Sequence, residues 1–154
     1  MSRRIDAPAA RVFAVLADPR RHAEFDGSET LRGAVSGSVI TGVGDIFMMR
    51  MYLEEVGEYV MMNYVVEFEP DRRIGWEPAP GDAAASEDGK YPIGVPAGHR
   101  WSFELTPDTS GATIVTEIFD ASSAPEELQE ATRDGEDWID AMTSTLARLE
   151  ELCT

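Results

Sequence analysis

Residues 138–153 of the chain read WIDAMTSTLARLEELC. Apolar residues recur in this stretch every three or four positions, which places them on one face of a helix: Trp138, Met142, Leu146, Leu149 and Cys153. The stripe begins earlier, at Leu128, and Ser123 and Glu126 have the spacing of a capping box, so we expect a long amphipathic helix with a weak point at Gly135. Such a helix needs an apolar partner surface.

The centre of the chain, residues 30–120, supplies that surface because its apolar residues follow a period of two. Residues at alternate positions share one face in two segments: Phe47, Met49 and Met51, then Trp101, Phe103 and Leu105. The longer run from residue 61 to 68 alternates in the same way. One face holds Met62, Tyr64, Val66 and Phe68, and the opposite face holds Met61, Asn63, Val65 and Glu67. Turn residues separate the runs, so we expect an antiparallel meander with one face covered by the helix.

The N-terminal part of the chain predicts two short helices. Asp6 and Pro8 are suited to a helix start, and apolar residues then recur on one face of a helix over about residues 7–17. Asp18 and Pro19 end this helix and can begin a second short turn. At 154 residues, the chain is expected to form one domain over residues 1–154.

Composition excludes several classes of function. A net charge of −16, from 29 acidic and 13 basic residues, repels phosphate backbones, so no nucleic-acid partner is expected. No apolar run is long enough for membrane insertion. The single cysteine, Cys153, and the lack of an export signal favour a cytoplasmic protein. With only His22 and His99 and no metal-binding spacing, neither a metal nor a cofactor is expected.

Three stretches resemble one known superfamily. Residues 4–19, RIDAPAARVFAVLADP, resemble the opening of START-like, or SRPBCC, proteins, and residues 98–105 and 111–116 resemble their last two strands. The ending around Trp138 is similar to the polyketide cyclase/dehydrase branch. The resemblance covers nearly the whole chain. It implies an α+β helix-grip fold, in which a curved antiparallel sheet of six to seven strands surrounds a long C-terminal helix, with two short helices near the N-terminus.

The same resemblance implies an elongated apolar pocket between the sheet and the C-terminal helix. Large aromatic and flexible methionine side chains on the predicted strands and helix are the candidates for contact with a ligand: Met49, Met51, Tyr64, Trp76, Trp101, Phe103, Trp138 and Met142. The first hypothesis is therefore binding of a small hydrophobic molecule, such as an aromatic metabolite, a polyketide-like compound or a lipid.

Two other functions stay open. A cofactor-free polyketide cyclase/dehydrase-type enzyme would need an acid or base, for which His99, Glu117 and Tyr64 are the candidates. His99 fits either the pocket mouth or an exposed strand start, and Glu117 either face of its strand. A module similar to the Hsp90 activators would act through its outer surface instead, and a homodimer is also compatible with the sequence.

Residue patterns give two further expectations. Arg50 and Asn63 fall opposite the bulky apolar positions on their strands, so both are expected to face solvent. Residues 79–97 are rich in Ala, Gly and Asp, which predicts a mobile loop near the pocket entrance.

Overall fold

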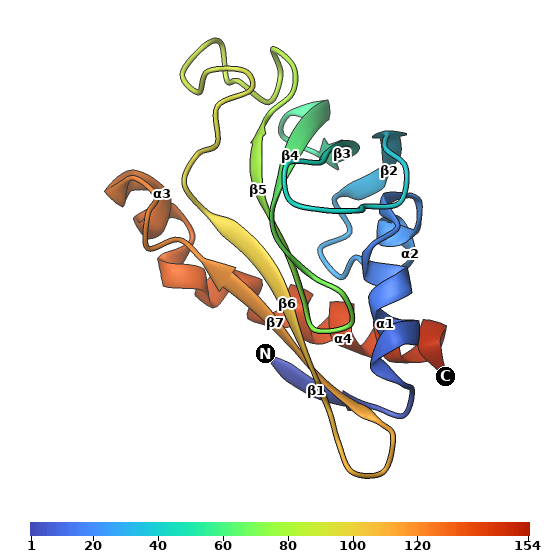
Figure 1. The fold of residues 1–154 in the computed structure, drawn as a ribbon. Helices are drawn as coiled ribbons and strands as arrows, with labels where there is room; N and C mark the ends of the chain where they lie inside the picture. The colour runs from blue at the N-terminus through green and yellow to red at the C-terminus, as the bar shows by residue number, and fades with distance from the viewer.

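The computed structural model describes residues 1–154 and contains one seven-stranded antiparallel sheet (Figure 1). Neighbouring strands follow the order β1-β7-β6-β5-β4-β3-β2, so all strands except β1 form a meander. The strands are β1 Ser2–Ile5, β2 Leu31–Ser36, β3 Ile46–Leu53, β4 Gly57–Glu69, β5 Arg73–Pro80, β6 Arg100–Pro107 and β7 Thr113–Asp120. The seven strands and their meander confirm the predicted antiparallel sheet of six to seven strands.

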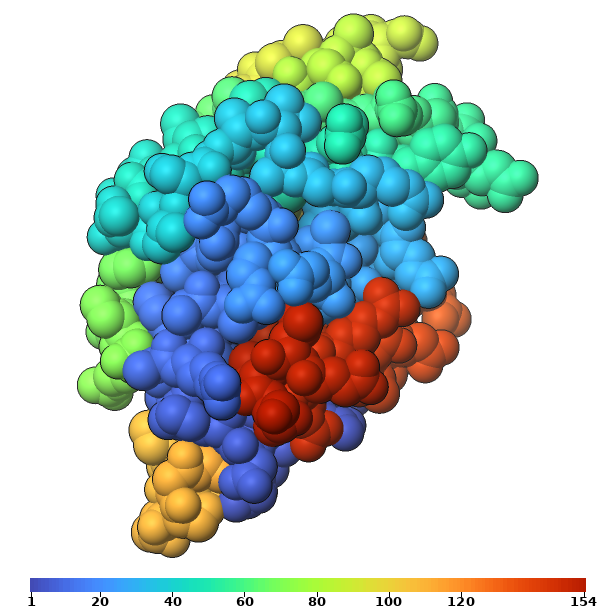
Figure 2. All heavy atoms as spheres, turned by 90° about the vertical axis from the view of Figure 1, so that its right-hand side faces the viewer, coloured from blue at the N-terminus to red at the C-terminus, as the bar shows by residue number.

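Helical segments lie on one side of this curved sheet (Figure 1). They are α1 Ala9–Leu16, a 3₁₀ turn at Pro19–Arg21, α2 His22–Phe25, α3 Glu126–Ala131, a 3₁₀ segment at Arg133–Trp138, and α4 Ile139–Cys153. Figure 2 shows the C-terminal end of α4 against the N-terminal helices. None of these helices has both the length and the apolar character needed to cross a membrane.

The core forms where α4 meets α1 and the sheet. Leu146, Leu149 and Cys153 are almost completely buried, and they belong to the same apolar cluster as Val12 and Leu16 of α1. The apolar stripe that the sequence predicts at spacings of three and four is therefore the face of α4 that packs inward.

The C-terminal helix is interrupted more strongly than the sequence predicts. Asp134 and Gly135 have φ angles of 55° and 93°, which no α-helix accommodates, so α3 and α4 are separate. The predicted weak point at Gly135 is thus a break. The predicted capping box does not form either, because α3 begins after Pro125 and no side chain caps it.

A β-bulge in β4 changes which side chains face the helices. The pairing of β4 with β5 shifts between Val65 and Glu67, and one extra residue in a strand moves the following side chains to the other face. Phe68 consequently packs on the core, with its ring 5.4 Å from that of Phe13, whereas Tyr64 points to the outer face. The sequence prediction assumes strict alternation along β4 and so assigns Tyr64 to the same face as Phe68. In the structure the two side chains lie on opposite faces.

The 81–98 connection packs on the outer side of the sheet. The Tyr64 hydroxyl donates a hydrogen bond of 2.6 Å to the carbonyl oxygen of Gly94, and Ser86 is buried and donates to the carbonyl of Tyr91. No residue of this connection lines the pocket described below. The connection therefore forms no part of the pocket wall, although Pro78 and His99 on either side of it do, and its mobility stays a prediction.

Candidate functional site

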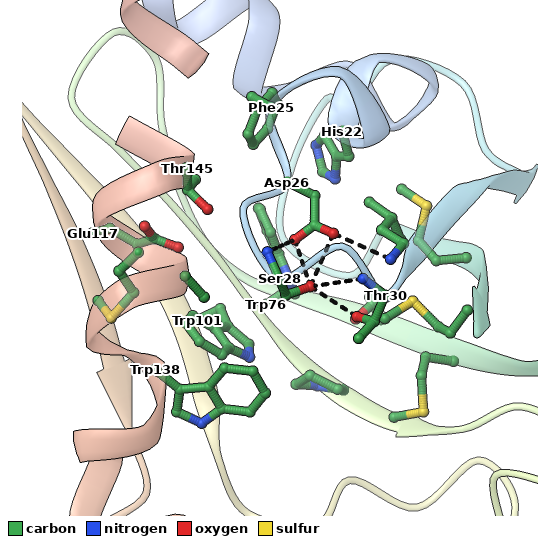
Figure 3. Close-up of a pocket in the computed structure, with 18 of the residues that line it drawn as sticks. His22, Phe25, Asp26, Ser28, Thr30, Trp76, Trp101, Glu117, Trp138 and Thr145 are labelled. Carbon is green, nitrogen blue, oxygen red and sulfur yellow. Dashed lines mark hydrogen bonds between the residues drawn. The ribbon is translucent and has the colours of Figure 1, made fainter. Parts of the chain in front are cut away.

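A cavity of about 280 Å³ lies between the concave face of the sheet and the helices (Figure 3). Strands β3 to β7, helix α2 with the loop after it, and α4 all contribute to its wall. The volume is close to the lower end of the range of known ligand sites, roughly 300–1,000 Å³. Most of the side chains that line the cavity are apolar.

Aromatic rings form one end of this cavity. Trp76 of β5 stacks on the imidazole of His22 with ring centroids 5.1 Å apart, and Phe47 packs edge-on against both rings. The Nε2 atom of His22 donates a 2.7 Å hydrogen bond to the carbonyl oxygen of Leu16, and burial lowers the pKa of His22 to about 4. His22 is therefore a neutral part of the wall.

A second group of rings forms the other end. Trp101 of β6 packs edge-on against Trp138, with centroids 5.2 Å apart, and Phe119 contacts both. The ring of His99 lies beside Phe119. Trp101 and Trp138 touch each other and still line the cavity, so they form a wall rather than the two sides of a ligand sandwich.

The loop after α2 is fixed against α4 by a close backbone approach. A side chain at Gly27 would come within 2.1 Å of the carbonyl oxygen of Ala141, so only glycine fits. The Gly27 amide donates to the hydroxyl of Thr145 at 3.0 Å. This contact holds Asp26 at the cavity, where its carboxylate accepts hydrogen bonds from Ser28 and from the amide of Leu31.

Glu117 of β7 reaches the cavity from the other side (Figure 3). Its side chain is 5% exposed and its cross-strand neighbour is Phe103. Burial raises the pKa of Glu117 to about 8; the amino group of Met1 opposes this rise and the charge of Asp26 adds to it. The carboxyl group is therefore largely protonated at neutral pH.

Three buried side-chain polar atoms of the chain have no hydrogen-bond partner within the protein, and their residues all line this cavity. They are Nδ1 of His99, Oε2 of Glu117 and Nε1 of Trp138. An unpaired buried polar group costs about 1–3 kcal/mol, so native structures rarely keep one without a reason. Their concentration at one cavity indicates a site that accepts polar groups of another molecule.

The structure brings most of the sequence candidates together. Seven of the eight proposed ligand contacts line the cavity: Met49, Met51, Trp76, Trp101, Phe103, Trp138 and Met142. Tyr64 does not, because of the bulge in β4. Of the acid and base candidates, His99 and Glu117 line the cavity, and burial lowers the pKa of His99. Arg50 is exposed as predicted, whereas Asn63 is 5% exposed and lines the cavity, contrary to prediction.

Several lining residues were missed from the sequence. Phe47 could have been found, because it shares the face of Met49 and Met51 at a spacing of two. Thr145 lies one turn beyond Met142 on the same helix face. No periodic pattern could have identified Asp26, because it lies in the turn after α2 and not in a strand or a helix.

Comparison with known sequences finds relatives but no matching family model. Over 120 residues the chain is 34% identical to the uncharacterized protein Rv0088 of Mycobacterium tuberculosis strain H37Rv, and 33% identical to the uncharacterized protein MT0096 of strain CDC 1551. The alignments cover 78% of this chain and 46% of each relative. The aligned region is therefore less than half the length of these relatives.

Solved structures with the same fold cover almost the whole chain. Protein Ms6760 from Mycobacterium smegmatis has a TM-score of 0.68 at 18% identity, covering 99% of this chain and 88% of its own. The AHSA1-like protein from Aeromonas hydrophila has a TM-score of 0.59 at 17% identity, covering 98% and 92%. These likenesses show the fold alone: the chain has the helix-grip fold that the sequence resemblance implies, with an antiparallel sheet around a C-terminal helix.

Proposed function

We propose that this protein binds a small hydrophobic molecule, aromatic or polyketide-like, in the cavity between the sheet and α4. The observation that carries the proposal is the apolar cavity of about 280 Å³ whose wall holds all three unpartnered polar atoms. An apolar wall favours the body of such a ligand through burial, and a few polar atoms fix its orientation. A close-packed core would leave neither the space nor the unpaired atoms.

Removal of the Trp101 indole tests this proposal. Trp101 lines the cavity and is only half-buried, so its loss should weaken binding of a planar neutral compound while the fold is retained. We expect Trp101→Ala to reduce affinity by about 1–3 kcal/mol, that is, about 5–150-fold. Calorimetric titration with 1-naphthalenemethanol measures the change, and circular dichroism checks the fold.

Tyr52→Ala is the matched control, because Tyr52 lies on β3 but is exposed and does not line the cavity. It should bind 1-naphthalenemethanol as the unchanged protein does. Equal affinities for the unchanged protein and a folded Trp101→Ala variant would contradict the proposal, as would equal losses in both variants.

An acid-base enzyme of the polyketide cyclase/dehydrase type is the second candidate function. Glu117 favours it, because a buried carboxyl group with a pKa of about 8 can accept or donate a proton near neutral pH. The outer sheet surface offers less support for an interaction module, since Arg73 and Arg100 form ion pairs there with Glu67. A docking surface of that kind needs an exposed apolar patch.

A further inference from the structure

The charges around the cavity are unbalanced. No lysine or arginine lines it, whereas two carboxyl groups, those of Asp26 and Glu117, do. Burial lowers the pKa of both His22 and His99, so neither imidazole carries a positive charge at neutral pH. Tyr59 is the remaining titratable group of the wall, and burial raises its pKa, so it stays neutral. The wall therefore supplies no cation to an anionic ligand.

The two carboxyl groups differ in their partners. Asp26 accepts hydrogen bonds from the amides of Ser28 and Leu31 and from the Ser28 hydroxyl. Glu117 is more than nine-tenths buried, and its Oε2 has no partner. In the view of Figure 3, Glu117 and Thr145 lie on one side of the cavity, with Asp26 on the other. Glu117 is thus the carboxyl group left for a bound molecule.

We propose that the ligand of this pocket is a hydrophobic amine, bound with its nitrogen against the carboxyl group of Glu117. The inference rests on the proposed binding function and narrows its ligand class. An ammonium N–H gives the buried Oε2 atom a charge-assisted hydrogen bond. The aromatic rings of the wall also favour a cation, and the net charge of −16 attracts one from solution.

The same features work against carboxylates and phosphates. Such an anion would lie in an apolar cavity beside two carboxyl groups, with no positively charged side chain to offset the loss of its water. The indole N–H of Trp138 can only donate, so it suits an oxygen acceptor elsewhere on the amine. A neutral alcohol cannot form the charge-assisted hydrogen bond of the amine. It also does not lose the hydration of a charge, as an anion would.

Proton balance gives the inference a distinct pH dependence. The complex holds one proton between the amine nitrogen and Glu117, whereas below pH 8 the two free partners together hold two. Binding an ammonium ion then releases the Glu117 proton to solvent. The affinity for an amine should consequently rise up to about tenfold per pH unit between pH 6 and 8. The other titratable groups of the cavity wall are His22, Asp26, Tyr59 and His99. Of these only Asp26 acts on Glu117 as a charge, together with the amino group of Met1.

Three probes with the same ring system test the inference: 1-naphthylmethylamine, 1-naphthalenemethanol and 1-naphthoic acid. In calorimetric titrations at pH 8 we expect the amine to bind at least tenfold more tightly than the alcohol, and the acid to bind more weakly than the alcohol. Below pH 8 the amine alone should release a proton, detected from the dependence of the heat on the ionisation enthalpy of the buffer. This comparison needs no substitution.

Glu117→Gln should reduce the preference for the amine over the alcohol to less than threefold and remove its rise with pH. Glu58→Gln is the matched control, because Glu58 is exposed on β4 and lies outside the cavity. This variant should keep both the preference for the amine and the rise of amine affinity with pH. Tight binding of the acid, or an amine preference that survives Glu117→Gln, would overturn the inference while leaving the binding function intact. No binding of any probe would contradict the binding function itself.

Discussion

Replacing Leu146 with aspartate should unfold the protein or lower its free energy of unfolding by about 4 kcal/mol or more. Leu146 is 2% exposed at the centre of the apolar face of α4. Shortening a buried leucine alone costs about 2–5 kcal/mol, and an unpaired buried charge adds to that cost. The loss would be a large part of the 5–15 kcal/mol that stabilises a typical domain. Urea unfolding followed by circular dichroism and tryptophan fluorescence measures it.

Thr143→Asp places the same charge on the same helix at an exposed position. We expect it to change the free energy of unfolding by less than about 1 kcal/mol, as surface substitutions usually do. Similar urea midpoints for Leu146→Asp and the unchanged protein would exclude the packing of α4 on the sheet.

Glu117→Gln should make the protein progressively more stable than the unchanged chain as the pH rises from 5 to 8. The pKa of Glu117 is about 8 in the folded protein, against an ordinary value of 4.5 when unfolded. Between these values the unfolded chain loses the proton and the folded chain keeps it, so folding stability falls with rising pH. Glutamine does not titrate. The difference in unfolding free energy should therefore grow by on the order of 3–5 kcal/mol over this range.

The difference between the two proteins isolates Glu117, because other titrating groups, such as His22, are common to both. Glu58→Gln is the matched control, because it makes the same replacement at an exposed position outside the cavity. Parallel stability curves for Glu117→Gln and the unchanged protein would contradict the burial of the Glu117 carboxyl group in the cavity wall.

Much of the fold could be predicted because the apolar residues of its helices and strands repeat at two simple spacings. A spacing of three or four selects Met142, Leu146 and Leu149 as the inner face of α4, and a spacing of two selects Phe47 and Met49 in β3. These residues are buried on both sides of the helix–sheet contact, so their pattern is strong. The superfamily resemblance then gave the order of the elements.

The faces of β4 and β7 show where such patterns fail. In β4 the bulge after Val65 turns Phe68 towards the core and leaves Tyr64 on the outer face. No residue type in this strand indicates a bulge. In β7, Val115 and Glu117 are buried, but Ile114 and Ile118 on the outer face are half-buried as well. Because both faces of β7 carry apolar residues, the alternation of apolar and polar residues could not decide on which face Glu117 lies.

Long-range contacts account for the other part of the site. Gly27 and Thr145 are 118 residues apart, and their hydrogen bond fixes the loop that carries Asp26 to the cavity. His22 enters the wall by stacking on Trp76 of a distant strand. A local sequence pattern contains no information on contacts of this range.

The most direct test of the proposed pocket uses the three tryptophans, since Trp76, Trp101 and Trp138 all line it and no other residue gives an indole N–H signal. The ¹⁵N-labelled protein would be titrated with 1-naphthalenemethanol and followed by NMR, with the amides of Gly42 and Gly111 as references outside the cavity. A molecule in the pocket should shift all three indole signals along one saturable curve while the reference amides stay in place. Unchanged indole signals at saturating probe, or shifts confined to residues outside the cavity, would contradict the assignment of this cavity as the binding site.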